Sequence, residues 1–225
     1  MEFSTPILIT GTGSFLTDAL TEGLRRLGFS DILCPAADIA DDALTALCKK
    51  AGYVVHLTDA ADPASTDRLL ACLTTAGSTA PLFAILPETE DGTHELTVYR
   101  HGEQAGSPVF VFRPYVIFGG REDGTLVSAL CKAAAAGQPL PCPESDEALP
   151  LVYVQDFVQT VVDAYDGAVM CDRSRYPLCR MLPVYEATPA QLAKLVESCA
   201  AGCCAEIAPD SLEEKICRTW QACQG

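Results

Sequence analysis

Short apolar runs alternate with amphipathic segments through the first half of the chain. The run Pro6–Thr10 is apolar and is long enough for a buried strand. In the following segment, Ser14–Leu27, apolar residues recur every three or four positions up to Gly28, which is typical of a helix that ends at a glycine. The two segments predict a first strand–helix unit.

The same alternation continues as far as Phe112. Further strands are expected at Asp31–Pro35, Tyr53–Leu57, Pro81–Leu86 and Pro108–Phe112, and further helices at Asp41–Ala51, Pro63–Ala76 and Thr93–Ala105. Strands that alternate with helices favour a parallel sheet covered on both faces. The predicted fold class is therefore α/β, with a Rossmann-type doubly wound parallel sheet.

Beyond Gly119 the elements follow one another less regularly. Helices are expected at about 125–136, 154–165 and 189–201, and a last one from Ser211, with a proline-rich segment at 139–150. Thr188 and Gln191 form a capping-box pattern with Pro189 at the first helical position. We expect residues 1–225 to form one unit, with a nucleotide-binding core at about 1–118 plus 151–168. A small C-terminal lobe on the substrate side would comprise about 119–150 and 169–225.

The composition narrows the range of partners. The 225 residues are 49% hydrophobic and carry a formal charge of −15, which would repel nucleic acid and anionic membrane surfaces. Neither a signal-peptide pattern nor an apolar run of membrane-spanning length is present in the sequence, so a cytoplasmic location is expected.

The chain has twelve cysteines, a number that would also suit a disulfide scaffold or a metal centre. The length and apolar content favour reduced thiols that act as small buried hydrophobic side chains. Because no Cys-x-x-Cys pair occurs, we predict no metal site.

The first strand leads into a Gly-x-Gly turn. Gly11 permits the tight bend and Gly13 allows the backbone to approach a pyrophosphate, whose charge the helix N-terminus favours. Leu16 occupies the position of the usual third glycine. The acidic residue that holds an adenosine ribose should end the second strand, but Cys34–Ala37 stands there and Asp38 comes slightly late. The expected cofactor is therefore NAD or NADP, with the choice open.

Four ordered segments carry a family resemblance. Thr10-Gly-Thr-Gly-Ser-Phe-Leu, Val54-Val-His-Leu-Thr, Phe112-Arg-Pro-Tyr-Val-Ile-Phe-Gly and Leu151-Val-Tyr-Val-Gln-Asp-Phe-Val resemble signature segments of the extended short-chain dehydrogenase/reductases, the NAD-dependent epimerase/dehydratase family of nucleotide-sugar enzymes. The tail, Pro183–Leu192 and Ile207–Asp210, resembles the reductase domain of capsular polysaccharide enzymes that act on UDP-amino-sugars. The sequence shows no counterpart of the cupin domain that follows there.

The resemblance implies roles for matching residues. It assigns the pyrophosphate to Gly11, Gly13, Ser14, Phe15 and Leu16, the flank of the cofactor to Leu57 and Thr58, and the nicotinamide to Pro114, Tyr115 and Val116. Arg113 would be structural, and Asp156 a helix cap. A nucleotide-sugar small molecule is the implied substrate class. A homodimer would form through the helices at 63–76 and 93–105.

The family's proton relay has no counterpart in this sequence. It uses a Tyr-x-x-x-Lys pair, and no tyrosine here lies four residues before any of the five lysines. If Glu95 matches the glutamate that follows that lysine, the pair falls on Pro87 and Asp91. Tyr99, followed by two basic residues, is the one nearby candidate for a displaced acid/base group. His56 is expected to be a hydrogen-bonded core histidine.

Three functions remain open at this stage. The first is an NAD(P)-dependent nucleotide-sugar reductase or epimerase that works with unusual residues. The second is a catalytically inactive pseudoenzyme that serves regulation or assembly. The third is a scaffold that binds no dinucleotide at all.

Overall fold

The computed structural model describes residues 4–11, 15–58, 64–86, 93–120, 124–170, 178–180, 184–202 and 208–224. The chain separates into two compact units. Unit 1 comprises Met1–Pro114 and Val158–Leu182, and unit 2 comprises Tyr115–Phe157 and Pro183–Gly225. Each unit has its own hydrophobic core.

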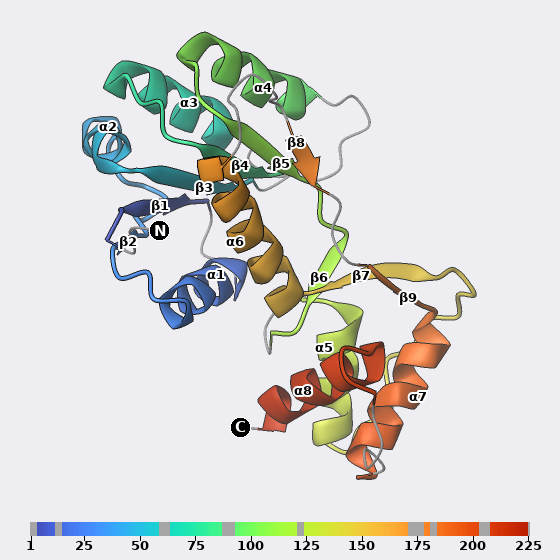
Figure 1. Cartoon of the computed structure of the whole chain (residues 1–225). Coiled ribbons are helices and arrows are strands. Elements are labelled where there is room, and N and C mark those ends of the chain that lie inside the picture. The colour runs from blue at the N-terminus through green and yellow to red at the C-terminus, as the bar shows by residue number, and fades with distance from the viewer. Residues whose placement is uncertain are drawn as a thin grey trace. The chain divides into compact units, whose positions relative to one another are not determined.

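Unit 1 is built on a parallel sheet. Its described strands are β1 (Ile7–Thr10), β2 (Ile32–Leu33), β3 (Tyr53–Leu57), β4 (Leu82–Ile85), β5 (Val109–Phe112) and β8 (Leu178–Arg180), in the spatial order β2-β1-β3-β4-β5-β8 (Figure 1). Every neighbouring pair runs parallel. The predicted Rossmann-type α/β fold is confirmed.

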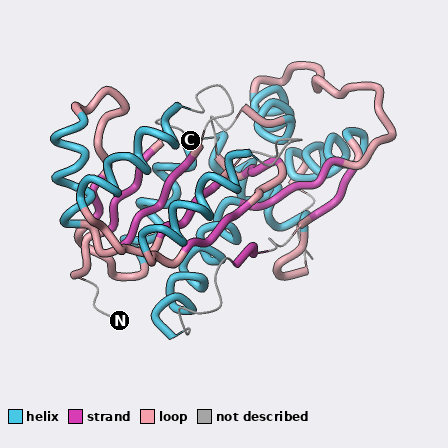
Figure 2. Tube along the Cα trace, turned by 90° about the horizontal axis from the view of Figure 1, so that it is seen from above, coloured by secondary structure: helices cyan, strands magenta, loops and turns pink. Residues whose placement is uncertain are grey.

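Helices cover both faces of this sheet. They are α1 (Phe15–Arg26), α2 (Asp41–Lys50), α3 (Ala64–Ala76), α4 (Thr93–Ala105) and the part of α6 (Val154–Met170) that belongs to unit 1. α2 packs on α3 and α3 on α4, whereas α1 meets α6 on the opposite face, where Gly23 lies against Val158 (Figures 1 and 2). The sheet is therefore doubly wound.

The period of two along the strands gives the two faces of the sheet different side chains. Leu82 and Val109 belong to the aliphatic core that also contains residues of α2, α3 and α4. Three of the alternate residues of β4 and β5 are aromatic, namely Phe83, Phe110 and Phe112, and the rings of Phe83 and Phe110 stack with their centroids 4.8 Å apart. These strands are buried on both faces, as expected for a parallel sheet between two helical layers.

Unit 2 contains a smaller sheet and three described helices. The strands are β6 (Val116–Phe118), β7 (Leu149–Tyr153) and β9 (Tyr185–Ala187), in the order β6-β7-β9, and the helices are α5 (Leu126–Ala135), α7 (Pro189–Ala200) and α8 (Leu212–Gln224). β7 runs parallel to β6 and antiparallel to β9. Phe118, Tyr153 and Trp220 belong to one buried cluster to which all three helices contribute.

Two local signals fix the starts of the helices α7 and α8. The Thr188 hydroxyl accepts a hydrogen bond from the Gln191 backbone N–H, and the Gln191 side chain accepts one from the Thr188 N–H, so the predicted capping box is confirmed. At α8 the Ser211 hydroxyl accepts from the Glu214 N–H at 3.2 Å, whereas the Glu214 carboxylate accepts from the Asp210 N–H at 2.7 Å.

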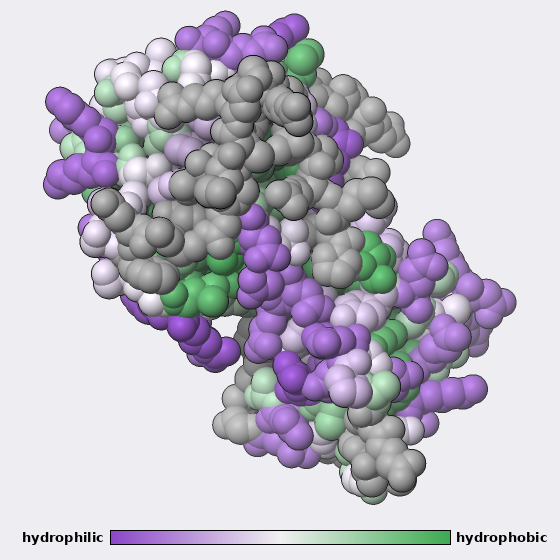
Figure 3. Space-filling view, viewed as in Figure 1, coloured by the Kyte–Doolittle hydropathy of each residue, from purple (hydrophilic) through white to green (hydrophobic). Residues whose placement is uncertain are grey.

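Hydrophilic side chains project over much of the visible surface (Figure 3). Among the described residues, the exposed large hydrophobic side chains are Leu27, Leu96, Tyr115, Val116 and Val184. Of the cysteines that the structure describes, Cys48, Cys72, Cys131, Cys199 and Cys223 are buried, which confirms their predicted role as core residues. No helix in the described part of the chain is long and apolar enough to cross a membrane.

Candidate functional site

The glycine turn after β1 lies directly against the end of β3. Gly11 has a φ of +123°, and a Cβ atom at this position would stand 2.2 Å from the Leu57 carbonyl oxygen. Both the backbone conformation and the lack of space therefore require glycine. The turn holds the carboxyl ends of two neighbouring parallel strands together.

A cavity of about 170 Å³ lies beside this turn, within unit 1. Its described lining residues come from the end of β1, the segment after β2, the start of α2, β3 and the start of α3: Thr10, Gly11, Pro35, Ala36, Ala37, Ile39, Leu44, His56, Ala64, Ser65, Arg68 and Leu69. From β1 the chain passes first to β2 on one side and then to β3 on the other, so the strand order reverses here. In open α/β sheets, ligands bind at the carboxyl ends of the strands at such a point.

His56 forms part of the cavity wall and is held by two hydroxyl groups. Its Nδ1 lies 2.9 Å from Thr10 Oγ1 and its Nε2 lies 3.0 Å from Thr66 Oγ1. The side chain is buried, and burial lowers the pKa of His56 to about 4. The imidazole is therefore neutral at pH 7, which confirms the prediction of a hydrogen-bonded core histidine.

Arg68 connects α3 to the segment between β2 and α2. Its Nε donates to Asp41 Oδ1 at 2.6 Å, its Nη1 donates to the Ala37 carbonyl oxygen at 3.1 Å, and its Nη2 donates to the Ile39 carbonyl oxygen. Because Ala37 and Ile39 line the cavity, the guanidinium fixes the wall that these residues form.

The structure brings some of the predicted cofactor residues together. Gly11 lines the cavity, and Leu57 lies against Gly11. The hydroxyl of the next residue, Thr58, lies 3.2 Å from Thr66 Oγ1. Phe15 and Leu16 begin α1 and are half-buried. Gly13 and Ser14 lie outside the described residues.

The residues expected near the nicotinamide fall at the boundary of the two units. Pro114 is the last residue of the first segment of unit 1, and Tyr115 and Val116 open unit 2. Tyr115 is 51% exposed and Val116 is 38% exposed. The role that the resemblance implies for them stays a prediction.

The region in which the family's Tyr-x-x-x-Lys pair would fall is described in part. Pro87 and Asp91 lie outside the described residues. Glu95, in the first turn of α4, forms an ion pair with Arg113, which supports the structural role expected for that arginine. Tyr99 is half-buried and packs against the aliphatic core of unit 1, and it is not among the described residues that line the cavity.

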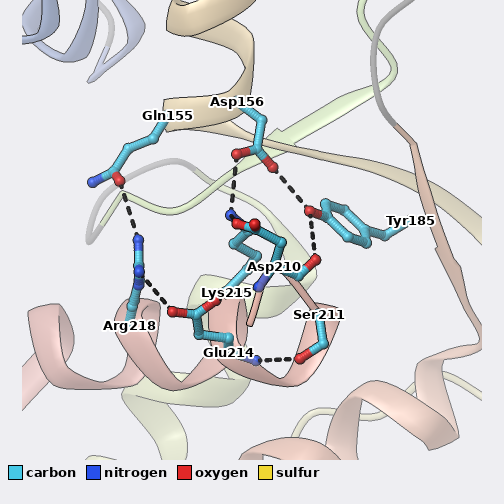
Figure 4. Close-up of polar contacts among 8 residues, drawn as sticks. All are labelled: Gln155, Asp156, Tyr185, Asp210, Ser211, Glu214, Lys215 and Arg218. Atoms are coloured by element: carbon cyan, nitrogen blue, oxygen red, sulfur yellow. Dashed lines mark hydrogen bonds and ion pairs between the residues drawn. The ribbon is translucent and has the colours of Figure 1, made fainter. Parts of the chain in front are cut away.

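Unit 2 contains a second set of polar side chains, centred on a buried lysine (Figure 4). Lys215 Nζ lies 3.1 Å from Asp156 Oδ1 and 3.2 Å from Asp210 Oδ1, and the Tyr185 hydroxyl donates to Asp156 Oδ2 at 2.9 Å. Lys215 Nζ also stands 5.1 Å from the centroid of the Tyr153 ring. These contacts connect α6, β9 and α8 within the unit.

The charges of this second set are stabilised by one another. Burial opposes the charged ammonium of Lys215, but its hydrogen bonds to Asp156 and Asp210 raise its pKa. Burial and the hydrogen bond to Asp156 raise the pKa of Tyr185 to about 12. A protonated phenol and a charged lysine that share one carboxylate form a structural cross-link, because neither is poised to accept a proton near pH 7.

Sequence reasoning missed Arg68 and Lys215. Arg68 is the one basic residue of α3, and its partners lie 27 to 31 positions away in sequence. Lys215 shares α8 with Arg218, and of its two carboxylate partners Asp210 lies 5 positions away and Asp156 lies 59 positions away. No motif in the sequence marks either residue.

Comparison with known proteins rests on structure alone. No family model matches the sequence, and no curated protein matches it significantly. Among solved structures, the capsular polysaccharide assembling protein CapF from Staphylococcus aureus is 18% identical, with a TM-score of 0.81 over 98% of this chain and 65% of CapF. The present chain thus spans slightly less than two thirds of the length of CapF.

Two further solved structures carry bound cofactors. The Thermus thermophilus UDP-glucose 4-epimerase in complex with NAD is 12% identical, with a TM-score of 0.73 over 98% of this chain and 99% of the epimerase. The Campylobacter jejuni GDP-mannoheptose C4 reductase MlghC with NADP bound is 11% identical, with a TM-score of 0.71 over 99% of both chains. The chain has the fold of nucleotide-sugar epimerases and reductases. At these identities the likeness establishes the fold and assigns no activity.

Proposed function

We propose that this protein binds NAD or NADP at the cavity in unit 1. The observation that carries the proposal is the position of the cavity. It lies at the carboxyl ends of β1 and β3, where the strand order reverses, and the Cβ-free Gly11 turn forms one side of it. The fold is shared with an epimerase solved with NAD and a reductase solved with NADP.

The cavity fits one part of a dinucleotide. Its volume of about 170 Å³ is below the roughly 300–1,000 Å³ of pockets that enclose a whole drug-sized ligand, so it would hold the adenosine end. The lining is largely apolar, with neutral His56 in one wall and a guanidinium at the rim. The bound cofactor would supply hydride chemistry; the residues described here would bind and orient its adenosine.

The chemistry that follows binding is part of the proposal. A nucleotide sugar is the substrate class that the shared fold supports, and the reaction would be a reduction or an epimerisation. The chain has no Tyr-x-x-x-Lys pair, and Tyr99 packs against the core of unit 1. This combination favours a second candidate function, a pseudoenzyme that senses or displays a cofactor without turnover.

Calorimetric titration with NADPH, NADP, NADH and NAD tests the binding. Ala36→Trp places a large ring on an exposed residue that lines the cavity, and it should abolish binding without disturbing the core. Ala46→Trp, on the exposed face of α2 outside the described lining, is the matched control and should bind as the wild type does. A wild-type protein that binds none of the four nucleotides overturns the proposal.

A turnover assay separates the enzyme from the pseudoenzyme. The protein with reduced cofactor would be mixed with UDP- and GDP-sugars, and the cofactor absorbance at 340 nm and the sugar products would be followed. If turnover occurs, Tyr99→Phe tests the displaced acid/base role, and unchanged turnover would exclude it. Cofactor binding without turnover of any sugar would favour the pseudoenzyme.

A further inference from the structure

The cavity carries a single positive charge. Of its lining residues that the structure describes, Arg68 alone has a charged side chain. The chain as a whole has a formal charge of −15, so a cavity wall whose one charged side chain is positive differs in sign from the protein as a whole. A ligand group that lies beside it is favoured if it is an anion.

The segment after β2 provides no opposing charge in the cavity wall. A carboxylate at the end of this strand binds the two ribose hydroxyls of NAD and repels the 2′-phosphate of NADP. Here the position is taken by Cys34, Pro35 and Ala36. Asp38 is exposed and is not among the described lining residues. The feature that would select NAD is thus not found in the described wall.

Arg68 has the geometry to hold a phosphate in addition to the segment between β2 and α2. Its hydrogen bonds to described residues use three of the five N–H groups of a guanidinium, one each on Nε, Nη1 and Nη2, so these contacts do not exhaust its donors. Its carboxylate partner, Asp41, has a side chain that is 74% exposed, so water screens much of that ion pair. The Arg68 side chain is 34% exposed and reachable from solvent.

We propose that Arg68 selects a 2′-phosphorylated adenosine, so that the protein prefers NADP and NADPH to NAD and NADH. The inference rests on the proposed cofactor binding and deepens it. Arg68 is then a specificity-determining residue that acts from α3, with its guanidinium beside the segment that follows β2.

Titration calorimetry with two fragments tests the pocket itself. Adenosine 2′,5′-bisphosphate carries the extra phosphate, and adenosine 5′-monophosphate lacks it. We expect the bisphosphate to bind at least about tenfold more tightly, which is the gain typical of one charge-assisted hydrogen bond. NADPH should exceed NADH by a similar factor. Equal affinities, or tighter binding of the forms without the 2′-phosphate, would overturn the inference.

Three variants assign the preference to Arg68. Arg68→Gln should remove the preference and bring the affinity for the bisphosphate down to that for the monophosphate. Asp41→Asn removes the competing carboxylate and should preserve or widen the preference. Arg26→Gln, at an exposed ion pair with Glu22, controls for general electrostatic attraction and should change nothing.

A purely structural role for Arg68 predicts a different pattern. If the guanidinium only holds the Ala37 and Ile39 carbonyls, Arg68→Gln weakens both fragments by the same factor and the selectivity ratio stays fixed. Arg68→Lys retains the charge without the forked geometry, and it should keep part of the ratio if the phosphate is contacted. Circular dichroism checks that the variants fold. A wild-type protein that binds none of the fragments or dinucleotides overturns the proposed function itself, whereas binding without selectivity overturns only this inference.

Discussion

A Cβ atom on Gly11 would stand 2.2 Å from the carbonyl oxygen of Leu57 and 2.7 Å from its Cβ. The close contact joins the turn after β1 to the end of β3, beside the proposed adenosine site. Because the obstacle is mainly backbone, a side-chain rotation cannot relieve it.

Gly11→Ala should therefore be among the most destabilising single changes in unit 1. We expect a loss of about 3 kcal/mol or more in the free energy of unfolding, from backbone strain and the clash together. Gly77→Ala is the matched control, since Gly77 also has a positive φ, +61°, but nothing lies within 4 Å of its Cβ position. That control should lose about 1–2 kcal/mol. Urea denaturation followed by circular dichroism measures both, and equal losses would contradict the proposed clash.

Lys215→Met tests the cross-link in unit 2. The side chain of Lys215 is 4% exposed, and removing its ammonium leaves Asp156, 23% exposed, with one partner fewer. A loss of about 2–3 kcal/mol is expected, somewhat below that for a fully buried pair because water reaches Asp156. Trp220, the only tryptophan in the sequence, is buried in the core of unit 2, so its fluorescence during urea denaturation reports this loss.

The control for Lys215 is Arg26→Met. Arg26 and Glu22 form an ion pair within one helix, with side chains 63% and 65% exposed. Its removal should cost less than about 0.5 kcal/mol. A loss at Lys215 no greater than that at Arg26 would show that the buried contacts contribute little.

The α7 capping box predicts a modest local effect. Thr188→Ala removes the hydroxyl that accepts from the Gln191 N–H and should cost about 1 kcal/mol. Thr75→Ala is a suitable comparison, because the exposed Thr75 hydroxyl only donates to the Ala71 carbonyl oxygen within its own helix. We expect the comparison variant to stay within about 0.5 kcal/mol of the wild type in thermal denaturation.

His56 predicts a pH dependence of stability. Burial lowers the pKa of His56 from 6.5 to about 4, so between these values the unfolded chain binds more protons than the folded protein. The stabilising contribution is complete above pH 6.5 and is lost as the pH falls towards 4, with a slope of up to about 1.4 kcal/mol per pH unit. Burial also lowers the pKa of His101, which acts in the same direction.

The variant His56→Gln should flatten that slope. Glutamine does not titrate, and its amide both donates and accepts hydrogen bonds, as the contacts with Thr10 and Thr66 require. Urea denaturation at pH 4.5, 5.5 and 7 measures the slope. An unchanged slope in His56→Gln would show that His56 is not its source.

The sequence pattern predicted unit 1 closely. Tyr53–Leu57 and Thr93–Ala105 have the predicted bounds, and the helix expected at Pro63–Ala76 begins one residue later. Each of these elements buries one face or both, so its apolar period carries the information. The second strand is shorter than predicted: it was expected at Asp31–Pro35 and is found at Ile32–Leu33, the two residues that pair with β1.

The small sheet of unit 2 was not predicted. β6 and β9 are three residues long, too short for a period of two to be distinguished from chance. β7 includes Pro150, a residue that usually argues against a strand. Such strands are defined by their pairing partners rather than by their own composition.

The cofactor roles that the resemblance implies stay predictions, but two of the residues concerned, Gly11 and Leu57, lie in contact in the structure. Gly11 and Leu57 follow from the glycine turn and the strand order, because the fold determines which strand ends meet. Arg68 and the wall at Ala36–Ile39 could not be foreseen, since their contacts join segments whose spacing no motif describes. The acidic position missing after β2 was visible in the sequence, but what faces the cavity instead required the structure.

The order of synthesis gives the strand β8 a separate significance. β8 pairs with β5 at the edge of the sheet, yet it is made only after the first segment of unit 2 has been completed. Protein synthesis adds about 5–20 residues per second, so β8 follows β5 by several seconds. During this time one edge of β5 has unpaired backbone N–H and C=O groups that can pair with strands of other chains. Nascent chains that stop between Phe112 and Leu178 should therefore aggregate more readily than the full-length protein.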